Sequence, residues 1–274
     1  MKTRFLIIGG DDRQLYLKRK FDENFYDSFH LRRPDDISAL DDIENYSHII
    51  LPVPVSKDKL TVYNSDSLVL NLNMLRDKLQ ACHIVFGCGF SDEFLNCLED
   101  KNITYYDFMK DKTFKLLNAH LTAQGALRDL LNNTDDVITG KKALIIGFGD
   151  VAKTLAVKLK AVGLEVHIAA RNKDQLSIAA LNGYKTIKLD MIRKSIYMFD
   201  FVFGTVPFNI LLVDDVKAMG EDSVYFELAS APYTAEKAFF KSFGRKYILS
   251  SSLPGKYLPK ASANIIYDFI LNNL

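Results

Sequence analysis

The stretch from residue 142 to residue 152, KALIIGFGDVA, decides the fold. Its apolar first half is typical of a buried strand, and the residues after it have the spacing of a helix. At the turn between them, Gly147 permits a tight change of direction, Gly149 leaves room for a pyrophosphate, and Ala152 lets the helix pack closely on the strand. The motif therefore predicts a dinucleotide at the helix N-terminus, where unpaired N–H groups attract phosphate. A plain strand–helix turn is the alternative.

The strand expected at 165–170 indicates which dinucleotide binds. Sites specific for NAD place Asp or Glu at the end of this strand to bind the ribose 2′-hydroxyl. Here Ala170 stands at that end and Arg171 follows it. A guanidinium suits a 2′-phosphate, so the sequence favours NADP over NAD. In the alternative interpretation Arg171 is a solvated surface charge and Asn172 caps the next helix.

Loops at the carboxyl ends of other strands should complete the site, because ligands of such sheets bind there. Thr205-Val206-Pro207 is expected beside the nicotinamide, and Ser230 and Leu253-Pro254-Gly255 beside the substrate. For each, an ordinary strand-ending turn is the alternative. The predicted cofactor-binding residues are then Gly147, Phe148, Gly149, Asp150, Val151, Ala152, Arg171, Asn172, Thr205, Val206 and Pro207.

The rest of the chain also alternates short apolar runs with helical segments, which is typical of α/β layers around mostly parallel sheets. Strands are expected at 5–8, 48–53, 84–86 and 103–108, and after a long helix at 143–146, 165–170, 186–189, 201–203, 224–228 and 247–249. Shorter helices are expected near 13–21, 92–99, 151–162, 174–181 and 234–243. The fold class is therefore α/β: two doubly wound Rossmann-like domains with an interdomain cleft and a long bridging helix.

These elements set the expected domain boundaries. Residues 1–112 form an N-terminal substrate domain, 113–134 the bridging helix, and 135–258 the NADP-binding Rossmann domain. A final helix, 260–274, is expected to pack back on the first domain.

Composition excludes several classes of partner. Lys and Arg total 35 against 34 for Asp and Glu, and this balance argues against binding to nucleic acid or an acidic membrane. No apolar run approaches the ~20 residues that a membrane helix needs. The cysteines, Cys82, Cys88 and Cys97, form neither a disulfide framework nor a zinc motif. We therefore expect a soluble, cytoplasmic protein without a metal, in which Cys88 is a small buried residue at a strand end.

A second glycine pair, Gly9-Gly10, also ends an expected strand. The carboxylates of Asp11 and Asp12 follow it and would repel a pyrophosphate, but they suit the positive end of a helix dipole. We expect a helix start here, with Arg13 as a substrate-binding candidate and a purely structural cap as the alternative.

The five histidines bear on mechanism. None follows His167, which excludes the late His–carboxylate pair that 2-hydroxy-acid dehydrogenases use. In the bridging helix, Asn118, His120 and Gln124 are the remaining candidates for a polar or proton-carrying role. The catalytic residue is left unassigned.

Taken in order, several segments resemble the A subunit of dipicolinate synthase. They are residues 7–14 (IIGGDDRQ), 50–53 (ILPV), 118–125 (NAHLTAQG), the glycine turn at 147–152, Ala170-Arg171, 228–230 (LAS), 253–255 (LPG) and Pro259-Lys260. The resemblance implies an oxidoreductase that oxidises dihydrodipicolinate to pyridine-2,6-dicarboxylate with NADP during spore formation. It also implies a dicarboxylate ligand and a B-type, flavoprotein-like partner subunit, and it leaves a homo-oligomer open.

The chain departs from that family at three positions. Ala231 stands where the family usually has Arg, Gln124 where it tends to have Glu, and Asp150 where the residue is often basic. A dicarboxylate substrate favours a guanidinium fork, which Ala231 removes. Two alternatives therefore stand beside the enzyme: a non-catalytic NADP-binding or assembly subunit, and a related dehydrogenase with a different small acid substrate.

Overall fold

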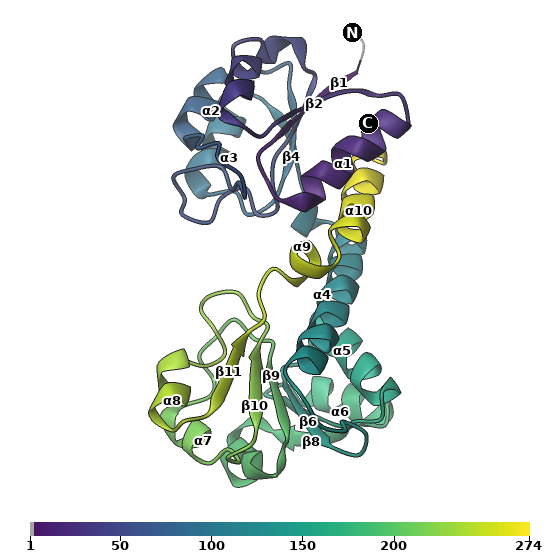
Figure 1. Ribbon diagram of the computed structural model, residues 1–274, viewed down its shortest axis with the longest axis vertical. Coiled ribbons are helices and arrows are strands. Elements are labelled where there is room, and N and C mark those ends of the chain that lie inside the picture. The colour runs from purple at the N-terminus through teal and green to yellow at the C-terminus, as the bar shows by residue number, and fades with distance from the viewer. Residues whose placement is uncertain (1–2) are drawn as a thin grey trace. The chain divides into compact units, whose positions relative to one another are not determined.

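The computed structural model describes residues 3–274 and divides the chain into two compact units (Figure 1). The first unit consists of the residues up to Asn118 together with Tyr257–Leu274, and the second consists of Ala119–Lys256. Each is built on a parallel sheet with helices on both faces. The predicted fold class of two Rossmann-like α/β domains is confirmed.

The first unit has a five-stranded sheet in the order β2-β1-β3-β4-β5. Its strands are β1 (Arg4–Ile8), β2 (Asp27–Leu31), β3 (His48–Ile50), β4 (Ile84–Gly87) and β5 (Thr104–Asp107), and all neighbours are parallel. The strand β2 was not predicted, because this edge strand reads DSFHL and only Leu31 in it is fully buried. The strand predicted at 48–53 is shorter than expected and ends before Pro52, which has no backbone N–H for a ladder.

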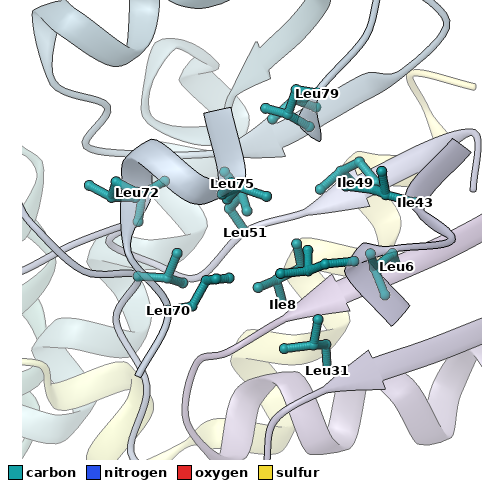
Figure 2. Close-up of a cluster of buried hydrophobic side chains, with 14 of the residues drawn as sticks. Leu6, Ile8, Leu31, Ile43, Ile49, Leu51, Leu70, Leu72, Leu75 and Leu79 are labelled. Carbon is teal, nitrogen blue, oxygen red and sulfur yellow. The ribbon is translucent and has the colours of Figure 1, made fainter. Parts of the chain in front are cut away.

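Both faces of β1 are buried, as expected for a central parallel strand. On one face, Leu6 and Ile8 meet the helix α2 (Leu72–Lys78) through Leu75, and Figure 2 shows this cluster. On the other face, Phe5 stacks on Phe21 of α1 (Asp12–Glu23) with ring centroids 4.3 Å apart.

The helix α10 (Pro259–Leu271) packs along α1 in the first unit (Figure 1). Tyr267 of α10 meets the ring of Phe21 edge-on at 5.1 Å, and Ile266 and Ile270 join the same buried cluster. The remaining helix of this unit, α3 (Asp92–Asp100), is capped as predicted by Ser91, whose side chain accepts a hydrogen bond from the N–H of Phe94.

The second unit has a six-stranded sheet in the order β11-β10-β9-β6-β7-β8. Its strands are β6 (Lys142–Ile146), β7 (Glu165–Ala170), β8 (Lys185–Lys188), β9 (Phe201–Gly204), β10 (Val224–Glu227) and β11 (Lys246–Leu249). The strand order reverses between β6 and β9, so the carboxyl end of β6 is the topological switch point at which ligands of such sheets bind.

Helices cover both faces of this sheet. They are α5 (Asp150–Ala161), α6 (Lys173–Leu181), α7 (Val213–Lys217) and α8 (Lys237–Ser242). The chain passes from the first unit to the second within α4 (Lys112–Asn132) and returns at the end of α9 (Leu253–Tyr257). Within residues 3–274, no helix is both long and apolar enough to span a membrane.

Two predicted local structures in this unit were wrong. The helix expected from residue 234 begins only at Lys237, because Thr234 and Ala235 are bound to the neighbouring loop and to Glu227. Leu253-Pro254-Gly255, expected as a loop at a strand end, is the start of α9. Leu253 is buried on α4 at Gly125, where an added Cβ would lie 2.7 Å from the Cβ of Leu253.

Candidate functional site

The glycine turn after β6 has the geometry that the motif predicts. Gly147 has φ +102°, and a Cβ built on it would lie 2.5 Å from Val206 Cγ2 and 2.7 Å from Thr205 Oγ1. Both the backbone conformation and the close approach of the neighbouring loop therefore exclude a side chain at this position.

Gly149 is open where Gly147 is crowded. It is the N-cap of α5 and has an ordinary φ of −81°. A Cβ built on it meets no atom of the chain within 4 Å. Its missing side chain thus leaves space in front of the first turn of α5, and a phosphate group fits such a space.

A pocket of about 590 Å³ lies at this end of the sheet. The predicted cofactor residues that line it are Gly147, Phe148, Gly149, Arg171, Asn172, Thr205, Val206 and Pro207. Asp150, Val151 and Ala152 are not among its lining residues, and Ala152 is fully buried in the first turn of α5. The pocket is also lined by residues that were not predicted, namely Ala169, Gln175, Leu189, Phe208, Asn209 and Ile210. Leu189 directly follows the strand β8. Because ligands of such sheets bind at the carboxyl ends of strands, this position could have predicted that Leu189 lines the pocket.

Arg171 follows the carboxyl end of β7 and is exposed. Ala170 before it is 3% exposed, so no carboxylate stands at the strand end. Asn172 is the N-cap of α6, and its side chain accepts hydrogen bonds from the N–H groups of Asp174 (2.7 Å) and Gln175 (3.3 Å). The capping interpretation of Asn172 is therefore confirmed, although the residue also lines the pocket.

The loop Thr205-Val206-Pro207 is fixed on two sides. The hydroxyl of Thr205 donates to the carbonyl of Ile146 at 2.7 Å. The hydroxyl of Thr234 donates to the carbonyl of Val206 at 2.7 Å and accepts from the N–H of Val206 at 3.2 Å. Thr234 is fully buried, and nothing in the sequence pattern indicated that it would hold this wall.

Behind this wall lies a buried carboxyl group. Glu227 is fully buried and accepts hydrogen bonds from Tyr225 Oη (2.8 Å) and from the N–H groups of Ala229 (3.1 Å) and Ala235 (3.2 Å). Burial raises the pKa of Glu227, while these hydrogen bonds lower it in part. Glu227 therefore anchors both ends of the segment that carries Thr234 and Ser230.

In the first unit, the residues that follow Gly9-Gly10 form the N-terminal cap of α1. Asp11 caps α1 and accepts from the N–H of Arg13, and Gln14 accepts from the N–H of Asp11, which completes a capping box. The Arg13 side chain is buried and binds both carboxylate oxygens of Asp11 at 2.8 Å and the carbonyl of Val53. Burial would raise the pKa of Asp11, but Arg13 lowers it. The role of Arg13 as a substrate contact stays a prediction.

The other candidates lie apart from the nucleotide pocket. Asn118, His120 and Gln124 lie on α4, and none of them lines this pocket. Ser230 is exposed, and their roles stay predictions. Cys88 is buried, as predicted, and burial raises the pKa of its thiol to about 12. Among residues 3–274, no group of three or more His, Cys, Asp or Glu side chains is arranged to hold a metal ion.

Comparison with known proteins identifies the first unit. Residues 4–109 match the family model for the N-terminal domain of the dipicolinate synthase A subunit. The first unit is therefore similar to the N-terminal domain of dipicolinate synthase A subunits. The resemblance inferred from the sequence is therefore confirmed. Residues 119–239 match the model of the S-adenosyl-L-homocysteine hydrolase NAD binding domain.

Solved structures share the fold over the whole chain. The A subunit of dipicolinate synthase from Bacillus halodurans is similar with a TM-score of 0.86 and 24% identity, covering 100% of this chain and 98% of that chain. The A chain of dipicolinate synthase from Bacillus subtilis gives 0.85 and 21%, covering 100% and 96%. A transhydrogenase from Sinorhizobium meliloti gives 0.70 and 11%, covering 97% and 83%. Together with the family match over residues 119–239, they show a dehydrogenase-type fold whose second unit is similar to an NAD-binding domain.

Proposed function

We propose that this dipicolinate synthase A-like chain is an NADP-dependent oxidoreductase subunit that oxidises dihydrodipicolinate to dipicolinate. The observation that carries the proposal is Arg171, an exposed guanidinium in the same pocket as Gly147 and Gly149. The family of the N-terminal domain supports the choice of substrate.

Features at both ends of the pocket support this choice of cofactor. The open position at Gly149 would receive the pyrophosphate, and Arg171 would pair with a 2′-phosphate that no carboxylate at Ala170 repels. NAD, the less favoured cofactor, lacks that phosphate and gains nothing from Arg171.

Bound NADP would accept a hydride from the dihydropyridine, whose ring becomes aromatic as a proton is lost to solvent. The chain then needs to orient the substrate and exclude water rather than supply a strong base. The Thr205-Val206-Pro207 wall, held by Thr234, would orient the reacting end of the cofactor. Arg13, Ser230 and the segment 253–255 remain the proposed substrate contacts.

The similar protein from Bacillus halodurans is one of the subunits of dipicolinate synthase, which supports a further subunit here. We propose a B-type, flavoprotein-like partner and a soluble, cytoplasmic location. A non-catalytic NADP-binding or assembly subunit is the second candidate. It is favoured by the exposed Ala231 in place of the family's Arg, and by the absence of Asn118, His120 and Gln124 from the lining of the described nucleotide pocket.

The deciding experiment incubates the protein with dihydrodipicolinate and NADP, alone and with a B-type subunit. A rise in NADPH absorbance is expected. Tight NADP binding without that rise under either condition would establish the second candidate instead. Arg171→Ala should weaken NADP binding far more than NAD binding, whereas Lys237→Ala, an exposed lysine at the start of α8, should change neither. Equal losses for both cofactors in Arg171→Ala would overturn the choice of NADP.

A further inference from the structure

A second pocket adjoins the nucleotide pocket. It measures about 870 Å³ and shares Ala170, Arg171, Leu189, Asn209 and Ile210 with its neighbour. Its other walls come from the start of α6, the turn after β8 and the segment before α7. Because Arg171 lines both pockets, a ligand in one can extend into the other.

The second pocket has an excess of positively charged lining residues. The cations that line it are Arg171, Lys173, Lys188, Arg193 and Lys194, and the carboxylates are Asp190 and Asp215. The whole chain has a net charge of only +1, so this excess is a local concentration of positive charge. Such a concentration attracts anions, most strongly at low ionic strength.

One of the two carboxylates is already committed to a partner. Asp215 is buried and accepts hydrogen bonds from Arg193 Nε at 3.0 Å and from the N–H of Leu212 at 2.9 Å. Arg193 also pairs with Asp214 at 3.3 Å. These contacts fix the guanidinium of Arg193 at the pocket wall and compensate the charge of Asp215.

The other four cations have no such partner. Within residues 3–274, the side chains of Arg171, Lys173, Lys188 and Lys194 make no hydrogen bond or ion pair. Some lysines elsewhere are paired, for example Lys78 with Asp41 at 2.8 Å and Lys141 with Asp136 at 2.7 Å. Unpaired cations around a concave surface leave their donors available to an external anion.

We propose that this pocket binds a phosphomonoester dianion. Three ammonium groups and the guanidinium of Arg171 offer the donors and charge that a tetrahedral dianion requires. Two sources share this chemistry: the 2′-phosphate of NADP reaching past Arg171, or the phosphate of a separate small molecule. The inference does not depend on the chain being an oxidoreductase.

The test measures binding of 2′,5′-ADP, 5′-AMP and inorganic phosphate by calorimetry to the full chain. The variant is Lys188→Ala/Lys194→Ala, since both lysines are exposed and their loss leaves the core intact. Lys237→Ala is the matched control. The double variant should weaken 2′,5′-ADP by about tenfold or more and reduce the dependence of its affinity on salt. It should weaken 5′-AMP less, because the proposed function places the 5′-phosphate at Gly149 and not in this pocket.

Competition separates the two sources. If inorganic phosphate displaces 2′,5′-ADP, the pocket serves the cofactor; if phosphate binds the NADP-saturated protein and the double variant abolishes this binding, the ligand is a separate molecule. Equal affinities of the double variant and Lys237→Ala for all three probes would overturn the proposal. Because these readouts are binding constants, failure of NADPH formation would count against the proposed oxidoreductase and not against this pocket.

Discussion

The hydroxyl of Tyr225 donates a hydrogen bond to the carboxyl group of Glu227 at 2.8 Å, and both residues are fully buried in β10. Residues two apart in a strand share a face, which brings the pair together. Gly204 of the adjacent β9 makes room for it, because a Cβ built there would overlap Tyr225 Oη. The neighbouring strand thus lacks a side chain where the interior polar contact needs space.

Tyr225→Phe should destabilise the protein, because it removes a donor from a carboxyl group that cannot reach water. We expect a loss of about 1–3 kcal/mol in the free energy of unfolding, measured by urea titration. Tyr247→Phe is the control, since Tyr247 stacks on Tyr225 at 5.4 Å and its hydroxyl is not among the donors to Glu227. Similar losses in the two variants would contradict a special role for the Tyr225 hydroxyl.

The two glycines of the turn should respond differently to substitution by alanine. Gly147→Ala places a Cβ against Val206 at positive φ, so it should cost about 1–3 kcal/mol of stability or more. Gly149→Ala meets no atom of the chain and should cost less than about 1 kcal/mol while strongly weakening NADP binding. Thermal melts and cofactor titrations distinguish the two effects. Unchanged cofactor affinity in Gly149→Ala would argue that no phosphate lies in front of α5.

Thr234→Val should loosen the Thr205-Val206-Pro207 wall, because it keeps the side-chain shape and removes both hydrogen bonds to Val206. We expect a stability loss of about 1–3 kcal/mol and weaker cofactor binding. Thr186→Val, an exposed position in β8, controls for the substitution itself. If cofactor affinity in Thr234→Val matched that of the control, the position of the Thr205-Val206-Pro207 loop would not depend on the two hydrogen bonds between Thr234 and Val206.

The first unit should lose stability as the pH falls below about 6.5. Burial lowers the pKa of His30, His48 and His83 below the ordinary value of 6.5. The unfolded chain therefore binds more protons than the folded one, so stability is complete above that value and falls as the pH drops through the folded pKa values.

His48→Phe should flatten this pH dependence, since it keeps a ring between Phe5 and Phe86 but cannot be protonated. Hydrogen exchange of the amides in β1 and β3, compared at about pH 7.5 and about pH 5.5, measures the effect. If the stability of His48→Phe fell with pH as steeply as that of the natural sequence, His48 would not contribute to the pH dependence.

The features that were predicted correctly depend on residues that lie close together in the sequence. The turn at Gly147 and Gly149, the cation at Arg171 and the cap at Asn172 each follow from residues close in sequence. β2 was missed because its edge position leaves most of its side chains polar, so no apolar run marks it. Thr234 and Glu227 were missed because their partners, Val206 and Tyr225, become visible only once the strands are in register. Leu253 was misplaced in a turn because its burial depends on Gly125, far away in the sequence.

The contact of α10 with α1 has a consequence for biosynthesis. Phe5 and Phe21 share their buried cluster with Ile266, Tyr267 and Ile270, so that core stays open on one side until α10 has left the ribosome. By then every strand of the second unit has been synthesised. Vectorial synthesis usually favours completion of the N-terminal domain first. In this chain we expect the reverse order, so a nascent chain halted after residue 256 should hold a finished nucleotide-binding unit and an incomplete first unit.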